Sequence, residues 1–173
     1  MGIEIPQNKF LILDGAMGTV LQQRGLSPQG RPELLNLTEP ELLDSVYKEY
    51  IAAGSQVIYA NTFGANGLKL AKTGHSVEEV VGAAIAVAKK AAAGTGTLVA
   101  LDVGPLGELL EPMGTLSFER AYDLFREMAE AGAKAGADLI VVETMTDLYE
   151  AKAALLAAKE AAKFGEVKIV ASS

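Results

Sequence analysis

A chain of 173 residues, half of them hydrophobic, is long enough for one domain with a substantial core. Its 15 Lys and Arg against 22 Asp and Glu give a net charge of -7, which argues against binding nucleic acid or an anionic membrane through a basic surface. The chain has no cysteine and one histidine, His75, which excludes disulfides, thiolate zinc sites and two-histidine mechanisms. No apolar run reaches the ~20 residues of a membrane span and residues 1–9 lack an apolar leader, so we expect a cytoplasmic protein.

Five short apolar runs, rich in residues that favour strands, predict five strands. They cover residues 10–13, 56–60, 97–101, 138–142 and 168–171. Between them, apolar residues recur at helical spacing within 42–51, 77–88, 118–129 and 148–158, which predicts four main helices. Ser76, Ser117 and Asp147 are predicted N-caps, and Thr38 with Glu41 has the spacing of a capping box. The alternation predicts an α/β domain with a parallel sheet.

Two architectures fit such a sheet. A flavodoxin-like doubly wound domain would be complete at this length and would hold its first strand inside the sheet. A (β/α)8 TIM barrel needs about 250 residues and arranges its strands in chain order, so this chain would supply part of one. That partial barrel would carry open strand edges, which favour self-association. Periodicity alone leaves both architectures open.

In either architecture the functional site lies at the carboxyl ends of the strands. There the sequence offers three carboxylates, Asp14, Asp102 and Glu143, together with Asn61 and Thr62, and no lysine or arginine. Carboxylates that gather without a basic partner repel one another unless a cation joins them. An amino acid would fit, with its ammonium between Asp14 and Glu143 and its carboxylate on backbone N–H groups of the following turn. The residues of that turn are Gly15, Ala16, Gly18 and Thr19.

Several of these residues also suit purely structural roles. Asp14 and Asp102 begin glycine-containing turns, and Asn61 and Thr62 are suited to satisfying backbone groups of their loop. Phe63 is expected in the core rather than at a ligand. Residues 15–18 match a phosphate-binding loop poorly, because no Lys-Ser/Thr pair follows them.

Five stretches at the strand ends resemble the homocysteine S-methyltransferase family, in family order and over nearly the whole chain. They are LDGAMGT at 13–19, PELLN at 32–36, YANTFGAN at 59–66, DVGPLGE at 102–108 and VETMTD at 142–147. In particular, the chain is similar to the homocysteine-binding barrels of the cobalamin-dependent members. The resemblance implies a partial (β/α)8 barrel in which residues 1–173 form the N-terminal half, and it favours that architecture over the flavodoxin-like one.

The resemblance also implies a chemistry, in which a methyl group is moved to the zinc-bound thiol of homocysteine to give methionine. It assigns the substrate's amino group to Asp14 and Glu143 and its carboxylate to the turn after Asp14, with Asn61, Thr62 and Asp102 lining the pocket. In the family, three cysteines from later strands bind the zinc, and this chain has none.

We therefore expect part of a longer enzyme that is inactive alone, with no catalytic residue, metal or cofactor of its own. Zinc, cobalamin recharged from methyltetrahydrofolate, and the missing half-barrel would belong to the parent protein. The alternatives are a structural half-barrel that associates with itself and a complete flavodoxin-like domain that binds a small ligand.

Overall fold

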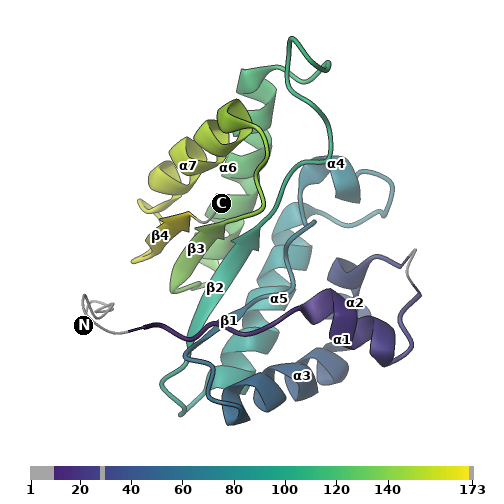
Figure 1. Ribbon diagram of the computed structural model, residues 1–173, viewed down its shortest axis with the longest axis vertical. Helices are drawn as coiled ribbons and strands as arrows, with labels where there is room; N and C mark the ends of the chain where they lie inside the picture. The colour runs from purple at the N-terminus through teal and green to yellow at the C-terminus, as the bar shows by residue number, and fades with distance from the viewer. Residues whose placement is uncertain (1–9, 28–29, 172–173) are drawn as a thin grey trace.

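The computed structural model of the chain describes residues 10–27 and 30–171. Four parallel strands form one sheet in which each strand pairs with the next strand of the chain (Figure 1). The strands are β1 (Val57–Tyr59), β2 (Leu98–Val103), β3 (Leu139–Val142) and β4 (Lys168–Ala171). This order excludes the flavodoxin-like alternative, because that fold requires its first strand inside the sheet.

The first predicted strand, residues 10–13, is present only as an isolated bridge between Leu13 and Val57. The segment nevertheless runs parallel to β1 and is tied to it, since the N–H groups of Gln56 and Val57 donate to Ile12 O at 2.8 and 3.2 Å. Phe10, at the start of the run, is 98% exposed. A short run with a neighbour on one side and little buried surface has too few contacts to hold a regular ladder. Within the described residues the sheet therefore has four regular strands, and the sequence predicts five.

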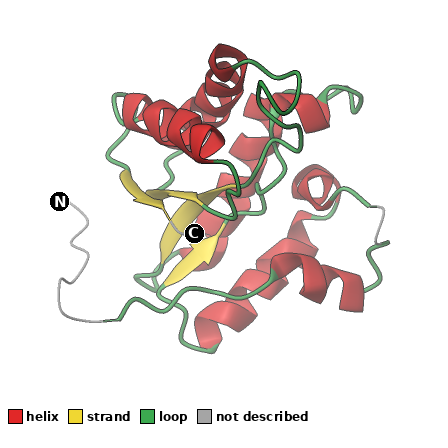
Figure 2. Ribbon diagram, turned by 45° about the horizontal axis from the view of Figure 1, so that its top comes forward, coloured by secondary structure: helices red, strands yellow, loops and turns green. Residues whose placement is uncertain are grey.

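Four long helices lie at the predicted positions and gather around the sheet (Figure 2). They are α3 (Pro40–Ala52), α5 (Val77–Ala92), α6 (Phe118–Lys134) and α7 (Leu148–Ala161). Each packs against the next, α3 on α5, α5 on α6 and α6 on α7. Within the described residues, none of the helices has the length and apolar character needed to cross a membrane.

Three of the predicted helix caps are confirmed and one is wrong. The side chains of Ser76, Ser117 and Asp147 accept hydrogen bonds from first-turn N–H groups of α5, α6 and α7. Thr38 does not cap α3, because the N-cap is Glu39 and the Thr38 hydroxyl donates backward to Leu34 O at 3.2 Å. The chain before Thr38 is already helical, which places its hydroxyl at the end of one helix instead of the start of the next.

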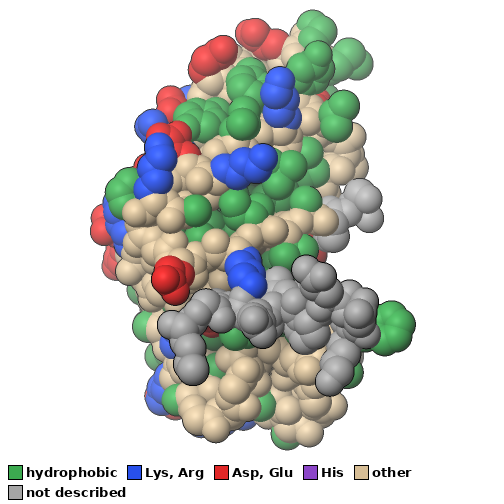
Figure 3. All heavy atoms as spheres, turned by 90° about the vertical axis from the view of Figure 1, so that its left-hand side faces the viewer, with side chains coloured by type: hydrophobic (Ala, Val, Ile, Leu, Met, Phe, Trp, Pro, Cys, Tyr) green, Lys and Arg blue, Asp and Glu red, His purple; other side chains and the backbone are tan. Residues whose placement is uncertain are grey.

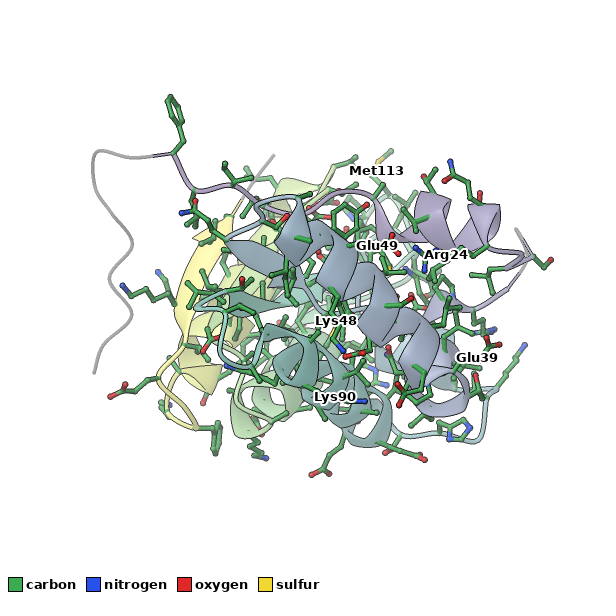
Figure 4. The ribbon with its side chains drawn as sticks, turned by 90° about the horizontal axis from the view of Figure 1, so that it is seen from below. Arg24, Glu39, Lys48, Glu49, Lys90 and Met113 are labelled. Atoms are coloured by element: carbon green, nitrogen blue, oxygen red, sulfur yellow. The ribbon has the colours of Figure 1, made fainter. Side chains whose placement is uncertain are left out.

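The connection between residues 15 and 40 contains short helices, and another short helix follows β1. They are α1 (Met17–Gln23), the 3-10 helix η1 (Pro32–Leu34), α2 (Leu35–Thr38) and, after β1, α4 (Gly67–Leu70). Arg24, which follows α1, points toward Glu49 of α3 and forms an ion pair at 2.5 Å (Figure 4). Arg24 also donates to the Ser45 hydroxyl at 2.8 Å. These contacts fix α1, and with it the turn after Asp14, against the outer helices.

The two faces of the sheet bury different sets of side chains. Ile58, Leu101 and Ile140 point into the main core, which the helices cover. On the opposite face, a second cluster is formed by Val57, Ala100, Leu139 and Val141. Side chains alternate along a strand, and the Glu143 N–H continues the ladder by donating to Val103 O at 3.1 Å. Tyr59, Asp102 and Glu143 therefore extend this second face at the carboxyl end of the sheet.

Candidate functional site

A cavity of about 400 Å³ lies at the carboxyl ends of β1, β2 and β3. Its lining includes eight of the nine candidate residues from the sequence, namely Asp14, Gly15, Ala16, Gly18, Asn61, Thr62, Asp102 and Glu143. Thr19 is the exception, since it is exposed on α1 and lies outside the lining. The lining also contains residues that the sequence did not single out for binding, namely Met17, Pro32, Glu33, Tyr59, Ala60 and Phe63.

Asp14 is held in the cavity by the backbone of β1. Its Oδ2 accepts a hydrogen bond from the Tyr59 N–H at 3.0 Å, and its own N–H donates to Val57 O at 3.0 Å. Burial raises the pKa of Asp14 to about 7 against the lowering effect of these backbone N–H groups, and the negative charge of Glu143 raises it further. Near neutral pH this carboxyl is therefore poised between its neutral and charged forms.

Asp102 ends up more deeply buried than Asp14, with 8% of its surface exposed. Burial raises its pKa to about 8, and the neighbouring carboxylates, first that of Glu143, act in the same direction. Its Oδ1 is buried and has no hydrogen-bond donor among the described residues. Such an atom carries a large desolvation cost unless a proton or a ligand satisfies it.

Glu143 is half-buried where β3 ends, and burial raises the pKa of its carboxyl as well. The next residue, Thr144, has φ 58°, in the left-handed region that residues other than glycine seldom adopt. Strained backbone of this kind is concentrated at functional sites. The turn directs the chain away from the sheet immediately after the carboxylate.

Asn61 and Thr62 line the cavity and also satisfy backbone groups. The Asn61 amide nitrogen donates to Pro32 O at 2.6 Å and to Asn36 Oδ1 at 3.1 Å, and its backbone N–H donates to the Tyr47 hydroxyl at 2.9 Å. The Thr62 hydroxyl donates to the Asp102 carbonyl at 2.9 Å and accepts from the Asp102 N–H at 3.0 Å. Asn61 and Thr62 therefore do both things that the sequence suggests: they line the cavity and they satisfy backbone groups of their loop.

Glu33 and Phe63 belong to the site although the sequence analysis did not place them there. Glu33 Oε1 accepts from the Gly64 N–H at 2.8 Å, which joins η1 to the loop after β1. Phe63 was expected in the core but is 37% exposed and lines the cavity, with its ring lying against Gly104. The expectation was wrong because a loop aromatic has no periodic pattern to show which way it faces; only its position inside the YANTFGAN stretch marked it.

The turn after Asp14 presents backbone N–H groups to the cavity rim. The first intrahelical bond of α1 runs from the Val20 N–H to Ala16 O at 3.4 Å, so the N–H groups of Met17, Gly18 and Thr19 precede it. The lining residue Gly15 lies close to Tyr50, whose hydroxyl would be 3.0 Å from a Cβ at this position. Free N–H groups at the start of a helix are suited to a carboxylate.

The electrostatic character of the cavity is acidic. Four of its lining residues carry carboxyl groups, and its lining contains no Lys, Arg or His. The nearby Lys69 instead donates to Pro105 O at 2.9 Å. Across residues 10–27 and 30–171, no group of three or more His, Cys, Asp or Glu side chains is placed to hold a metal ion. The arrangement suits an organic cation that also carries a hydrogen-bond acceptor, the chemistry of an amino acid.

Comparison with known sequences gives one consistent family. A family model described as homocysteine S-methyltransferase matches residues 11–173. The methionine synthase of Mycobacterium tuberculosis is 31% identical over 174 residues, which cover 92% of this chain and 14% of that protein. The methionine synthase of Mycobacterium leprae is 30% identical with the same coverage. The chain thus spans about 14% of the length of these curated relatives.

Solved structures agree with the sequence comparison. The metallated form of the homocysteine methyltransferase MmuM from Escherichia coli superposes with a TM-score of 0.78 at 28% identity, over 92% of this chain and 62% of that one. Its oxidised form gives a TM-score of 0.79 at 29% identity, over 93% and 61%. With the in-order parallel sheet, this similarity confirms the prediction of a partial (β/α)8 barrel. The matched family model and both relatives lead to one conclusion: the chain belongs to the homocysteine S-methyltransferase family.

Proposed function

We propose that the cavity is the amino-acid-anchoring part of an enzyme that methylates homocysteine to methionine. The ligand ammonium lies between Asp14 and Glu143, and its carboxylate accepts from the N–H groups in the first turn of α1. The observation that carries the proposal is the cavity itself, which collects four carboxyl groups and no basic side chain. A primary ammonium provides the missing charge and up to three donors.

The thiol chemistry needs groups that this chain does not contain. The family resemblance implies a zinc-bound thiolate, but the 173 residues have no cysteine and one histidine. His75 is exposed and pairs with Glu79 at 3.1 Å on α5. These residues do not fit a zinc site, so in this proposal the chain binds and orients the amino-acid end of the substrate. Methyl transfer, zinc and cobalamin are assigned to the parent protein.

Calorimetry with L-homocysteine and L-methionine tests the proposal. We expect both to bind, and we expect Asp14→Asn and Glu143→Gln each to weaken binding by about tenfold or more, because each removes a charge-assisted hydrogen bond. Glu119→Gln on the exposed start of α6 is the matched control and leaves affinity unchanged. A second control is 4-(methylthio)butanoate, which lacks the amine and should bind far more weakly than methionine. A folded chain that binds neither amino acid at any pH would contradict the proposal.

A second candidate function is self-association through the sheet edge. Among the described residues β4 pairs with β3 alone, and Val170 on it is 36% exposed. Figure 3 shows hydrophobic side chains exposed beside Lys or Arg side chains on the side of the molecule where α7 and β4 lie. Sedimentation velocity over a range of concentrations tests this: association that Val170→Lys abolishes supports it, and a monomer at every concentration rejects it.

A further inference from the structure

The proposed contact of Asp14 and Glu143 with the ligand ammonium gives no role to the buried carboxyl of Asp102. Its Oδ1 lies in the wall of the cavity with no donor among the described residues. The Thr62 hydroxyl bonds to the backbone of Asp102 and not to this side-chain oxygen. An ionised carboxylate left in this position would be strongly destabilising, whereas a neutral acid is tolerated.

The surroundings of Asp102 offer no compensating positive charge. The groups that act on it or on which it acts come from five elements: Asp14 before α1, Glu33 on η1, Tyr47 on α3, Tyr59 on β1 and Glu143 after β3. Three of them are carboxyl groups and two are neutral phenols, and none of these described groups is a cation. Burial together with nearby carboxylates raises the pKa of Tyr59 to about 12. The negative potential of these carboxylates therefore also reaches Tyr59 on the neighbouring strand. A proton on Asp102 is the simplest way to reduce this accumulation of negative charge.

We propose that Asp102 is the proton-exchange residue of the amine site: a neutral carboxylic acid in the ligand-free cavity that releases its proton to solvent when a ligand ammonium enters. The inference rests on the proposed function, because the ammonium is the cation that replaces the proton. The exchange is balanced, since the O–H bond of Asp102 breaks, its H⁺ leaves to solvent, and the charge of one R–NH₃⁺ takes the place of that proton; the ligand carboxylate is held separately by backbone N–H groups of the turn after Asp14. Asp102 thereby makes the site selective for cationic ligands, because a ligand without an amine cannot displace the proton.

The pH dependence distinguishes this exchange from a simple pair of carboxylates. Carboxylates of ordinary pKa are fully ionised at pH 6, so affinity for an ammonium would be flat from about pH 6 to pH 8. With the pKa of Asp14 at about 7 and that of Asp102 at about 8, the two ionised forms required for binding become more populated over this range. Between pH 7 and pH 8 affinity should rise about tenfold, of which about twofold comes from Asp14.

The experiment is calorimetry of the whole chain with L-methionine, which has no thiol to lose a proton. Titrations at about pH 7.5 in two buffers of different ionisation enthalpy give the number of protons released per ligand. We expect most of one proton from the wild type and a clear reduction in Asp102→Asn, whose rise in affinity from pH 7 to pH 8 should shrink to about twofold. Glu119→Gln, a carboxyl removed from exposed surface, should behave as the wild type.

Each outcome decides one point. Methionine binding without proton release overturns the exchange but leaves the amine site standing. Equal proton release from Asp102→Asn and the wild type overturns the assignment to Asp102. Absence of methionine binding at every pH overturns the proposed function and the exchange with it. Should Asp102→Asn fail to fold, infrared spectra of Asp14→Asn decide, because this variant removes the other carboxyl that is partly neutral near pH 7: loss of the remaining neutral carboxylic-acid band at saturating methionine supports the exchange, and persistence of that band refutes it.

Discussion

Thr62 and Asp102 exchange two hydrogen bonds, in which the Thr62 hydroxyl donates to the Asp102 carbonyl at 2.9 Å and accepts from the Asp102 N–H at 3.0 Å. One side chain therefore satisfies both backbone groups of the most buried acid in the cavity. The pair joins the loop after β1 to β2 at the wall of the cavity. Thr62 is fully buried, so its main contribution is to hold the geometry of the site.

Thr62→Val should keep the shape of this contact and lose both hydrogen bonds. Two buried backbone groups would be left unpaired, so we expect the free energy of unfolding to fall by about 2–4 kcal/mol. Chemical denaturation measures the change. Thr62→Ser, which keeps the hydroxyl, should lose much less, and equal losses in the two variants would show that packing and not hydrogen bonding is what Thr62 provides.

Stability should fall as pH rises from about 4 to about 8, because Asp14 and Asp102 have folded-state pKa values of about 7 and about 8. In the unfolded chain these groups ionise near their ordinary value of 3.8, so between the two values the folded state binds more protons. The contribution of Asp14 and Asp102 to the free energy of unfolding is fully present below about pH 4, and it is lost as pH rises through their folded pKa values. Their contribution runs opposite to that of salt-bridged carboxylates.

Asp102→Asn isolates the contribution of Asp102 to this slope. We expect the variant to be more stable than the wild type at about pH 8, by about 3–5 kcal/mol, and nearly equal to it at about pH 4, because the difference builds up between the unfolded and folded pKa values of Asp102. Urea denaturation at both pH values checks the difference. A constant offset between the two proteins at all pH values would mean that Asp102 does not titrate in the folded state over this range.

Gly104→Ala should damage the site through Phe63. A Cβ at this position would lie 2.4 Å from Phe63 Cε2, so the ring must move away from the cavity wall. We expect a loss of about 1–3 kcal/mol in stability and weaker methionine binding. Gly82→Ala in α5 is the matched control: its added Cβ has nothing within 4 Å, and a helical glycine replaced by alanine should gain about 0.5–1 kcal/mol. Adding Phe63→Ala to Gly104→Ala should recover part of the lost stability.

Ser76 and Thr38, two of the three Ser/Thr positions that the sequence marks as caps, should differ in their cost of replacement. Ser76 accepts from the Glu79 N–H at 3.1 Å at the start of α5, so Ser76→Ala should lose about 1 kcal/mol. Thr38→Ala removes a hydroxyl that caps no helix and should cost only a few tenths. Thermal melts of both variants test this, and equal losses would argue against the cap assignment at Glu39.

The long helices, the last four strands and the position of the cavity could be predicted because each rests on a repeated local pattern. Asp102 and Glu143 are two good examples: Asp102 lies near the end of β2 and Glu143 directly follows β3, and alternation from Ala100 and Val141 places both on the same face. The strand at 10–13 could not be judged in the same way, because its regularity depends on neighbours and not on its own residues.

Other features of the site depended on contacts between segments far apart in the chain. Glu33 lies in a short helix with no periodic pattern, and its place at the cavity follows from a bond to Gly64, which is 31 residues away. Thr19 was grouped with the turn after Asp14, but the start of α1 rotates it to the exposed side. Phe63 faces the cavity because Gly104 leaves room for its ring, and a sequence motif does not reveal such a pairing.

The order β1-β2-β3-β4 has a consequence for biosynthesis. Because each strand finds its partner in the strand made just before it, the sheet can grow in the direction in which the ribosome delivers the chain. Each strand pairs with the one before it, as Leu98 does with Val57 and Lys168 with Leu139, so no pairing needs a partner from the far end of the sheet. Every intermediate length exposes one unpaired parallel edge, so the nascent protein depends on the next strand, or on a chaperone, to shield the last one made.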